Sequence, residues 1–259
     1  MLLQITSKEN PLIKYAVKLS KRAFRYEEKR FLFEGEKLLT EALQCEIKIR
    51  EAFFTKDTAE KYKKNAEFLA NKGAKLYIIS EELMKKISDT ETPQGIICIA
   101  EFFETQSVDS LKQGKFIALV GLQDTGNVGA VIRCADAFSL DGVIIDKTSA
   151  DIFSPKTIRG SMGSIFRTKI VFADNLLDEI KSLKNNGFKI NAAVLDKKSK
   201  PVNEIKWTGS DIVIIGNESA GISEELIKNC QTVYIPMKGR AESLNASVAA
   251  GIIAWEMTK

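Results

Sequence analysis

The feature that most constrains the fold of this chain is a regular alternation of short apolar runs with helical patterns in its C-terminal part. The apolar runs lie near residues 116–121, 143–145, 169–172, 188–194, 212–215 and 233–235. Segments with helical spacing separate them. Strands that alternate with helices in this way form a largely parallel sheet that helices cover. The sequence therefore predicts one α/β domain over residues 116–259.

A smaller α/β unit precedes this domain. Strand-like runs alternate with helical segments near residues 31–33, 52–54, 76–79 and 96–100. The chain then becomes polar from Glu104 to Lys115, which is typical of a connection between domains. We therefore divide the chain into residues 1–104, a linker over residues 105–115, and residues 116–259.

The C-terminal segment combines a strand, a loop and a helix. Ser243 is expected to cap this helix, which carries Val248, Ile252 and Trp255 on one apolar face. Polar side chains and free backbone N–H groups meet where the helix begins, and an electron-rich ligand can bind there. A well-capped terminal helix without a ligand explains the same pattern.

The absence of histidine narrows the possible chemistry. None of the 259 residues is His. The chain therefore lacks the commonest general base, every Ser–His or Cys–His pair, and most transition-metal sites. We expect no metal. Any reaction must use other polar groups or a cofactor that is already activated.

Cysteine usage and hydropathy indicate the compartment. The four cysteines are widely scattered and form no Cys-x-x-Cys pair, which predicts neither a disulfide framework nor a zinc site. No apolar run is long enough to span a bilayer, and the first residues lack a signal-peptide pattern. We therefore expect a cytoplasmic protein with reduced thiols and no membrane partner.

Positive charge is concentrated at the N-terminus. Residues 1–30 contain eight Lys or Arg and three Glu, although the formal net charge of the whole chain is only +4. A helix is expected to begin at Asn10-Pro11. The side chains expected to bind phosphate from this arm are Lys18, Lys21, Arg22 and Arg25. Taken alone, a solvated helix face is the simpler explanation of this charge.

Three motifs in the C-terminal domain carry a family resemblance. Residues 119–133 read LVGLQDTGNVGAVIR, residues 212–222 read IVIIGNESAGI, and residues 235–247 contain Ile-Pro-Met followed by Ser-Leu-Asn-x-Ser. Each motif alone is weak, but the three in this order make a strong signal. Together they resemble the motifs of the SpoU-type (TrmH-like) RNA ribose 2′-O-methyltransferases, which belong to the SPOUT class.

The resemblance implies a fold and an activity. The catalytic domain would be a SPOUT-type parallel-sheet domain whose C-terminal segment forms a trefoil knot, and a small RNA substrate-binding domain would precede it. The protein would be a homodimer that transfers a methyl group from S-adenosyl-L-methionine to a ribose 2′-hydroxyl. We expect ribosomal RNA as the substrate.

The resemblance also assigns residues to the site. The residues implied near the reacting atoms are Asn127, Arg133, Glu218, Ser243 and Asn245. Those implied in cofactor binding are Gly216, Asn217, Ile235, Met237 and Leu244. In the segment 149–170, Lys156 and Arg159 would contact RNA, with a helix bearing surface cations as the alternative.

Arg133 needs a role that a cation can perform. A guanidinium group stays protonated in proteins, so Arg133 is unsuited to be a general base. We expect it to stabilise the developing alkoxide and to orient the hydroxyl group, with a nearby phosphate as the proton relay. Its apolar neighbours in the helix suggest that it has a partner.

Other functions share part of this evidence. A tRNA ribose methyltransferase would carry the same motifs, and a non-catalytic RNA-binding or ribosome-assembly protein could retain the fold. The complete polar set favours an enzyme. A methyltransferase that acts on a base is disfavoured by the Asn-x-Gly and Arg pattern of the first motif. Locally, Asn127 could simply cap a helix, and Glu218 could be a solvated turn residue.

Overall fold

The computed structural model describes residues 2–259 and divides them into two compact units. The first unit comprises the residues up to Glu104 together with Asp151–Phe166. The second comprises Thr105–Ala150 and Arg167–Lys259. The segment 151–166 lies within the C-terminal domain predicted from the sequence, but in the structure it packs with the first unit.

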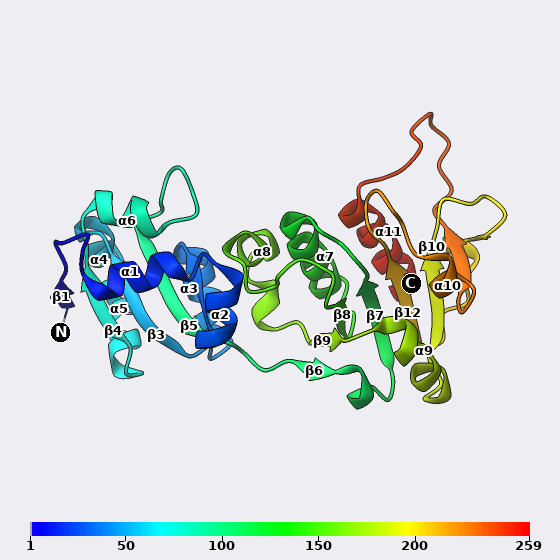
Figure 1. The fold of residues 1–259 in the computed structure, drawn as a ribbon, viewed down its shortest axis with the longest axis horizontal. Coiled ribbons are helices and arrows are strands. Elements are labelled where there is room, and N and C mark those ends of the chain that lie inside the picture. The colour runs from blue at the N-terminus through cyan, green and yellow to red at the C-terminus, as the bar shows by residue number, and fades with distance from the viewer. Residues whose placement is uncertain (1) are drawn as a thin grey trace. The chain divides into compact units, whose positions relative to one another are not determined.

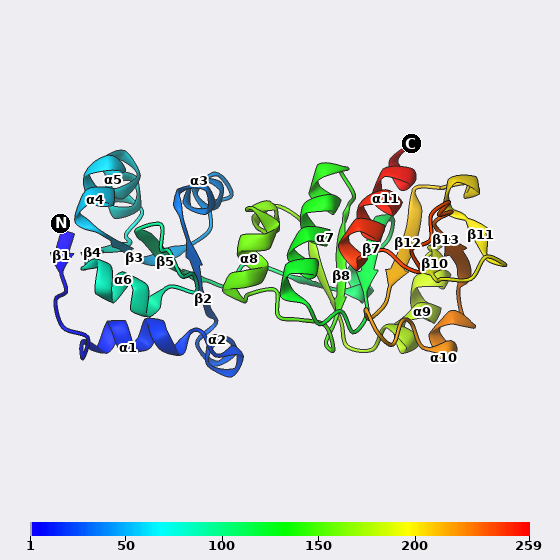
Figure 2. The ribbon, with the colours of Figure 1, turned by 90° about the horizontal axis from the view of Figure 1, so that it is seen from above.

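The first unit is a five-stranded sheet with helices on both faces. Its elements are β1 (Leu2–Gln4), α1 (Pro11–Lys18), α2 (Arg22–Glu28), β2 (Arg30–Glu34), α3 (Glu36–Gln44), β3 (Ile49–Phe54), α4 (Lys56–Lys61), α5 (Lys63–Asn71), β4 (Lys75–Ile78), α6 (Glu81–Ile87), β5 (Ile96–Glu101) and α8 (Pro155–Ser161). The strand order is β1-β4-β3-β5-β2. Figure 2 shows α3, α4 and α5 on one side of the sheet, and α1, α2 and α6 on the other.

The N-terminal helix begins where the sequence predicts. Asn10 caps α1 by accepting a hydrogen bond from the backbone N–H of Leu12, and Pro11 occupies the first turn. Ile13 and Ala16 are buried, and they belong to the same core cluster as residues of α6. The chain leaves the helix after Lys18 and starts α2 at Arg22, so a single helical face does not continue past this break.

The second unit is an eight-stranded sheet in which all paired strands are parallel (Figure 1). Its elements are β6 (Gln106–Ser107), β7 (Gly114–Leu119), α7 (Thr125–Ala137), β8 (Gly142–Asp146), β9 (Ile170–Ala173), α9 (Leu176–Asn185), β10 (Lys189–Ala193), β11 (Lys200–Pro201), β12 (Ser210–Ile215), α10 (Glu224–Ile227), β13 (Gln231–Tyr234) and α11 (Ala246–Thr258). The strand order is β11-β13-β10-β12-β7-β8-β9-β6. The six predicted strands are therefore confirmed, while the two-residue strands β6 and β11 were not expected.

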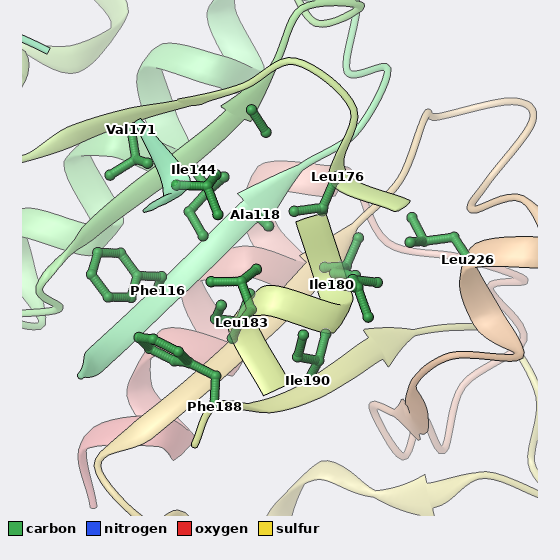
Figure 3. Close-up of a cluster of buried hydrophobic side chains, with 14 of the residues drawn as sticks. Phe116, Ala118, Ile144, Val171, Leu176, Ile180, Leu183, Phe188, Ile190 and Leu226 are labelled. Carbon is green, nitrogen blue, oxygen red and sulfur yellow. The ribbon is translucent and has the colours of Figure 1, made fainter. Parts of the chain in front are cut away.

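The core of the second unit forms because alternate strand residues point to the same face of the sheet. Figure 3 shows Phe116, Ala118 and Ile144 packed together with Ile180 and other apolar residues of α9. On the other face, α7 and α11 pack against each other, and both contact β7. This arrangement fixes the first turns of α7 and α11 near the ends of the central strands.

Candidate active site

The candidate site lies where the central strands β7 and β12 end. These strands are parallel neighbours, with Leu119 paired to Ile215, so the loops that follow them meet at one edge of the sheet. Open parallel sheets bind ligands at this edge. The loop after β7 leads into α7, and the loop after β12 contains Glu218.

Three polar side chains from the three motifs form a hydrogen-bonded line, which we call the polar row: Asn245, Asn127 and Glu218. The Nδ2 atom of Asn127 donates to Oε1 of Glu218 at 3.0 Å. The Nδ2 atom of Asn245 donates to Oδ1 of Asn127 at 3.0 Å. Segments that are far apart in the sequence are thus joined by one row of side chains.

The way in which α7 and α11 are capped leaves the side-chain amide groups of Asn127 and Asn245 able to bond to each other. Asp124 caps α7 by accepting a hydrogen bond from the backbone N–H of Asn127 at 2.8 Å. The Asn127 side chain is therefore not the cap, and the simple capping alternative is excluded. Asn245, and not the expected Ser243, caps α11, because its Oδ1 atom accepts from the backbone N–H of Ser247 at 2.9 Å. Its Nδ2 atom remains directed to Asn127.

A second set of contacts fixes the loop beneath the row. The backbone N–H of Gly121 donates a hydrogen bond to Oδ1 of the buried Asp146 at 3.1 Å. The carbonyl oxygen of Gly121 accepts a hydrogen bond from Nδ2 of Asn217 at 2.8 Å. Gly121 has a φ of 66°, a conformation that favours glycine. Asp146 was not among the predicted site residues, although its position at the end of a buried strand was a usable signal.

The turn after β12 requires its glycine. A Cβ atom on Gly216 would lie 2.4 Å from the carbonyl oxygen of Gly221, which is too close for any side chain. The Oδ1 atom of Asn217 accepts hydrogen bonds from the backbone N–H groups of Ser219 and Ala220, both at 2.9 Å. The side chain of Asn217 therefore holds this turn and the β7 loop at the same time.

The environment of Glu218 favours its ionised form. Burial alone would raise the pKa of the Glu218 carboxyl group. Hydrogen bonds from the Asn127 side chain and from backbone groups at Gln123 and Asp124 outweigh burial, so this pKa lies below its ordinary value. The polar row therefore ends in a carboxylate at neutral pH.

An open cleft of about 610 Å³ lies over the polar row. Its lining residues are Gln123, Asp124, Asn127, Glu218 and Asn245. Its volume is in the range of small-molecule sites. The predicted cofactor residues Ile235, Met237 and Leu244 are half-buried in the loop between β13 and α11 and are not part of this lining.

Arg133 and Ser243 do not line the cleft. Arg133 lies on the exposed side of α7, and no ion pair or hydrogen bond to it is found among residues 2–259. The expected partner of Arg133 is not found within residues 2–259, where Val131 and Ile132 point into the core while Arg133 points to solvent. Ser243 is exposed in the loop before α11.

The predicted phosphate-binding side chains of the N-terminal arm separate into two groups. Lys18, Lys21 and Arg22 are exposed. Arg25 is only 3% exposed, and its Nε atom donates to Oδ2 of Asp151 at 3.0 Å. Its Nη1 atom also donates to backbone carbonyl oxygens of the α1–α2 connection. The expectation that Arg25 lies on the basic face is therefore corrected: its charge is neutralised inside the first unit.

The other two predicted RNA contacts lie on α8, in the first unit. Lys156 is exposed. Both terminal nitrogen atoms of Arg159 donate to Oδ2 of Asp89 at 3.2 Å. A phosphate group would have to compete with Asp89 for this guanidinium group.

Comparison with known proteins places the chain in a class. Residues 114–255 match the SpoU rRNA Methylase family, and residues 10–98 match the MRM3-like substrate binding domain. The parallel sheet and these matches define a SPOUT-class protein, which confirms the predicted fold class of a parallel-sheet catalytic domain preceded by a substrate-binding domain. The chain belongs to the SpoU rRNA Methylase family.

Individual relatives cover nearly the whole chain. The Bacillus subtilis 23S rRNA (guanosine(2553)-2′-O)-methyltransferase RlmP is 33% identical over 98% of this chain and 98% of its own length. The AdoMet-bound rRNA methyltransferase from Sinorhizobium meliloti has a TM-score of 0.89 at 30% identity, covering 99% of this chain and 97% of that one. AviRb from Streptomyces viridochromogenes, in complex with AdoMet, has a TM-score of 0.83 at 25% identity, covering 96% and 97%.

Two further features bear on ligands and surroundings. Among the residues that the structure describes, no group of three or more Cys, Asp or Glu side chains is placed to hold a metal ion. Within the same residues, no helix is long and apolar enough to cross a membrane.

Proposed function

We propose that this protein methylates a ribose 2′-hydroxyl of ribosomal RNA at the cleft over the polar row. The enzyme is an S-adenosylmethionine-dependent RNA 2′-O-methyltransferase. The observation that carries the site assignment is the hydrogen-bonded line of Asn245, Asn127 and Glu218, because it joins one residue from each of the three motifs.

The residues of the cleft suit the methyl donor. S-adenosylmethionine supplies, when bound, a methyl group on a positively charged sulfur atom. The Asp124 and Glu218 carboxylates give the cleft a negative wall that favours a cation. Half-buried Ile235, Met237 and Leu244 in the adjoining loop offer apolar contacts for an adenine ring, and Gly216 lets the chain turn tightly beside it. No step of this assignment requires a metal.

The polar row is suited to orienting a nucleotide. Its amide groups are already fixed by hydrogen bonds on both sides of Asn127, so they need no rearrangement when a ribose arrives. Asn127 and Asn245 would hold the sugar, with Ser243 in the nearby loop. The ionised Glu218 fixes the orientation of the Asn127 amide.

Arg133 is proposed to act on the attacking oxygen. Its guanidinium group would stabilise negative charge that develops on the 2′-oxygen and would orient that oxygen for in-line attack. An adjacent RNA phosphate would accept the proton. Because Arg133 is exposed and lies outside the cleft of its own chain, a second copy of the chain is the arrangement that would complete the site.

An apolar strip on α11 supports this homodimer. Val248 and Trp255 lie on the same helix and are 50% and 52% exposed, so they could be covered by a second copy of the chain. Trp255 lies beside the C-terminal end of α7, with 5.8 Å between its ring centroid and that of Phe138. Trp255→Glu should convert a dimer to a monomer in light scattering and should reduce methyl transfer. Equal masses for the variant and the wild type would contradict this interface.

The first unit is proposed to dock the RNA. Lys18, Lys21 and Arg22 are exposed cations that could bind phosphate. Lys156 is exposed on α8, and Arg159 could join this set after leaving Asp89. Ribosomal RNA is preferred over transfer RNA because this unit matches a substrate-binding domain and a relative over nearly the full length acts on 23S rRNA. A cytoplasmic location follows from that substrate and remains a prediction.

The test is transfer of a labelled methyl group from S-adenosylmethionine to purified ribosomal RNA and transfer RNA, followed by mapping of 2′-O-methylated nucleotides. We expect the protein to methylate one nucleotide of ribosomal RNA. The same nucleotide should lack the methyl group in ribosomal RNA from cells without the protein. Methylation of transfer RNA alone would select the tRNA alternative. Tight RNA binding without any transfer would select the non-catalytic one.

A further inference from the structure

Helix α2, its C-terminal cap and the residue after β5 bring together a group of rings and cations that the methyl-transfer site does not use. We call it the α2 surface: Arg22, Tyr26, Lys29 and Phe102. All four residues belong to the first unit. The two cations are exposed and the two rings are half-buried.

The rings of the α2 surface are fixed from below. The Phe102 ring stacks on Phe153 with 3.6 Å between centroids and 7° between planes. The Tyr26 ring lies edge-on to Phe102 at 5.2 Å, and its hydroxyl group donates to Oδ1 of Asp151 at 3.1 Å. Asp151 is itself held by the buried Arg25. The rings therefore form a rigid support that does not depend on a ligand.

Cations cover the outer side of this support. The guanidinium carbon of Arg22 lies 5.5 Å from the centroid of the Tyr26 ring. The ammonium group of Lys29 lies 6.0 Å from the Tyr26 centroid and 6.0 Å from the Phe102 centroid. At an exposed site such contacts are weak. The cations can therefore leave the rings when a stronger partner arrives.

RNA offers stronger partners for both components. Phosphate groups attract Arg and Lys, and base stacking on an aromatic ring is stronger than an exposed cation–ring contact. Only an unpaired nucleotide can bring its base face to the rings while its phosphates reach the cations, because bases in a duplex are already stacked. The guanidinium plane of Arg22 can itself stack on a base.

We propose that the α2 surface binds an unpaired stretch of the substrate RNA, with a base stacked on the Tyr26 ring and phosphates bound by Arg22 and Lys29. This inference rests on the proposed function, since it takes RNA as the substrate. It adds the kind of RNA: a substrate that contains a loop, a bulge or a single-stranded end. Lys18 and Lys21 extend the positive charge along the same arm.

The test compares an unstructured RNA oligonucleotide with a duplex of the same sequence, using three variants. Tyr26→Leu removes the ring, and Tyr26→Phe removes only the hydroxyl group that binds Asp151. Phe68→Leu is the matched control, because Phe68 has its own cation contact, from Lys72 at 5.7 Å, on α5, which lies across the sheet from α2 (Figure 2).

We expect Tyr26→Leu to weaken binding of the unstructured RNA roughly tenfold and to change duplex binding little. Tyr26→Phe and Phe68→Leu should bind both RNAs like the wild type. If Tyr26→Leu does not fold, photo-crosslinking of 4-thiouridine RNA to the wild type replaces it. Crosslinks should then map to Tyr26 or Phe102.

The outcomes separate this inference from the proposed function. The inference would be overturned if Tyr26→Leu bound unstructured RNA like the wild type, or if it lost affinity equally for unstructured and duplex RNA. Crosslinks that avoid the α2 surface would also overturn it. In each case the protein would still transfer methyl groups to ribosomal RNA, so the proposed function would stand. Wild-type protein that neither binds RNA nor transfers a methyl group to ribosomal RNA would overturn both.

Discussion

Replacing Asn127 by Asp changes the polar row at one atom. In the wild type, Asn127 accepts a hydrogen bond from Asn245 through Oδ1 and donates one to Glu218 through Nδ2, each at 3.0 Å. Asn127→Asp keeps the acceptor for Asn245. It replaces the donor by an oxygen atom that faces the Glu218 carboxylate.

Two effects set the size of the perturbation. A hydrogen bond to a charged group contributes about 1.5–3 kcal/mol when buried, and the row is largely exposed, so its loss costs about 1 kcal/mol here. Two like charges about 4 Å apart in water repel by about 1 kcal/mol. Together they amount to about 2 kcal/mol, roughly a 30-fold shift away from the formed row at about 1.4 kcal/mol per tenfold.

The pH dependence identifies the charge. Because hydrogen bonding lowers the pKa of Glu218 in the folded wild type, its stabilisation is present above the unfolded-state pKa and is lost as pH falls. In Asn127→Asp, repulsion raises the pKa values of the two carboxyl groups. The variant's deficit should therefore be greatest near pH 7 and should shrink as the pH approaches about 4, where carboxyl groups become protonated.

The assay is single-turnover methyl transfer at pH 7, with S-adenosylmethionine affinity by calorimetry and stability by urea unfolding from pH 7 to 4. Asn127→Asp combined with Glu218→Gln is the control, because it removes the repulsion and restores a donor opposite the new carboxylate. We expect this double variant to recover part of the lost transfer. The reasoning would be refuted if Asn127→Asp transferred methyl groups at the wild-type rate. It would also be refuted if the double variant lost as much transfer activity as the losses of the two single variants combined.

Three other predictions follow from the same structure. Arg133→Lys should lower single-turnover transfer at least ~100-fold, about 2.7 kcal/mol at 1.36 kcal/mol per tenfold, with S-adenosylmethionine affinity retained; near-normal turnover would show that charge alone suffices. Lys18→Gln with Lys21→Gln should weaken RNA binding and lower its salt dependence, and an unchanged salt slope would make both residues solvated surface. Arg25→Met should lower the free energy of unfolding in urea by about 3–5 kcal/mol, because it leaves the Asp151 carboxylate buried without a cation. The double variant Arg25→Met with Asp151→Leu should lose much less stability. Equal losses in the two variants would show that the effect comes from packing and not from the unpaired charge.

The strand pattern and the motif turns were readable because they depend on local chemistry. Runs such as 116–121 and 212–215 are apolar and β-branched, and the structure forms β7 and β12 there. The turn at Gly216 follows equally from the residues themselves, since a side chain at that position would meet the next part of the turn. Fold class therefore came from the sequence.

The details of the site were less readable. Sequence reasoning gave the α11 cap to Ser243, yet Asn245 holds it, because the cap depends on where the chain enters the helix after a long loop. Asp146 was missed because its partner, the backbone N–H of Gly121, lies on another strand's loop. Arg133 was expected to need a partner, but the rotation of α7 on the sheet turns it to solvent.

The sequence by itself determined an α/β chain with two units, three motifs at the ends of strands, and a basic N-terminal arm. Only the tertiary structure decided which side chains meet. It joined Asn127 to residues 91 and 118 positions away, and it withdrew Arg25 from the basic face by pairing it with a carboxylate 126 positions later. The reason is physical: strand order and helix rotation set the neighbours of a polar group, and a local pattern contains neither.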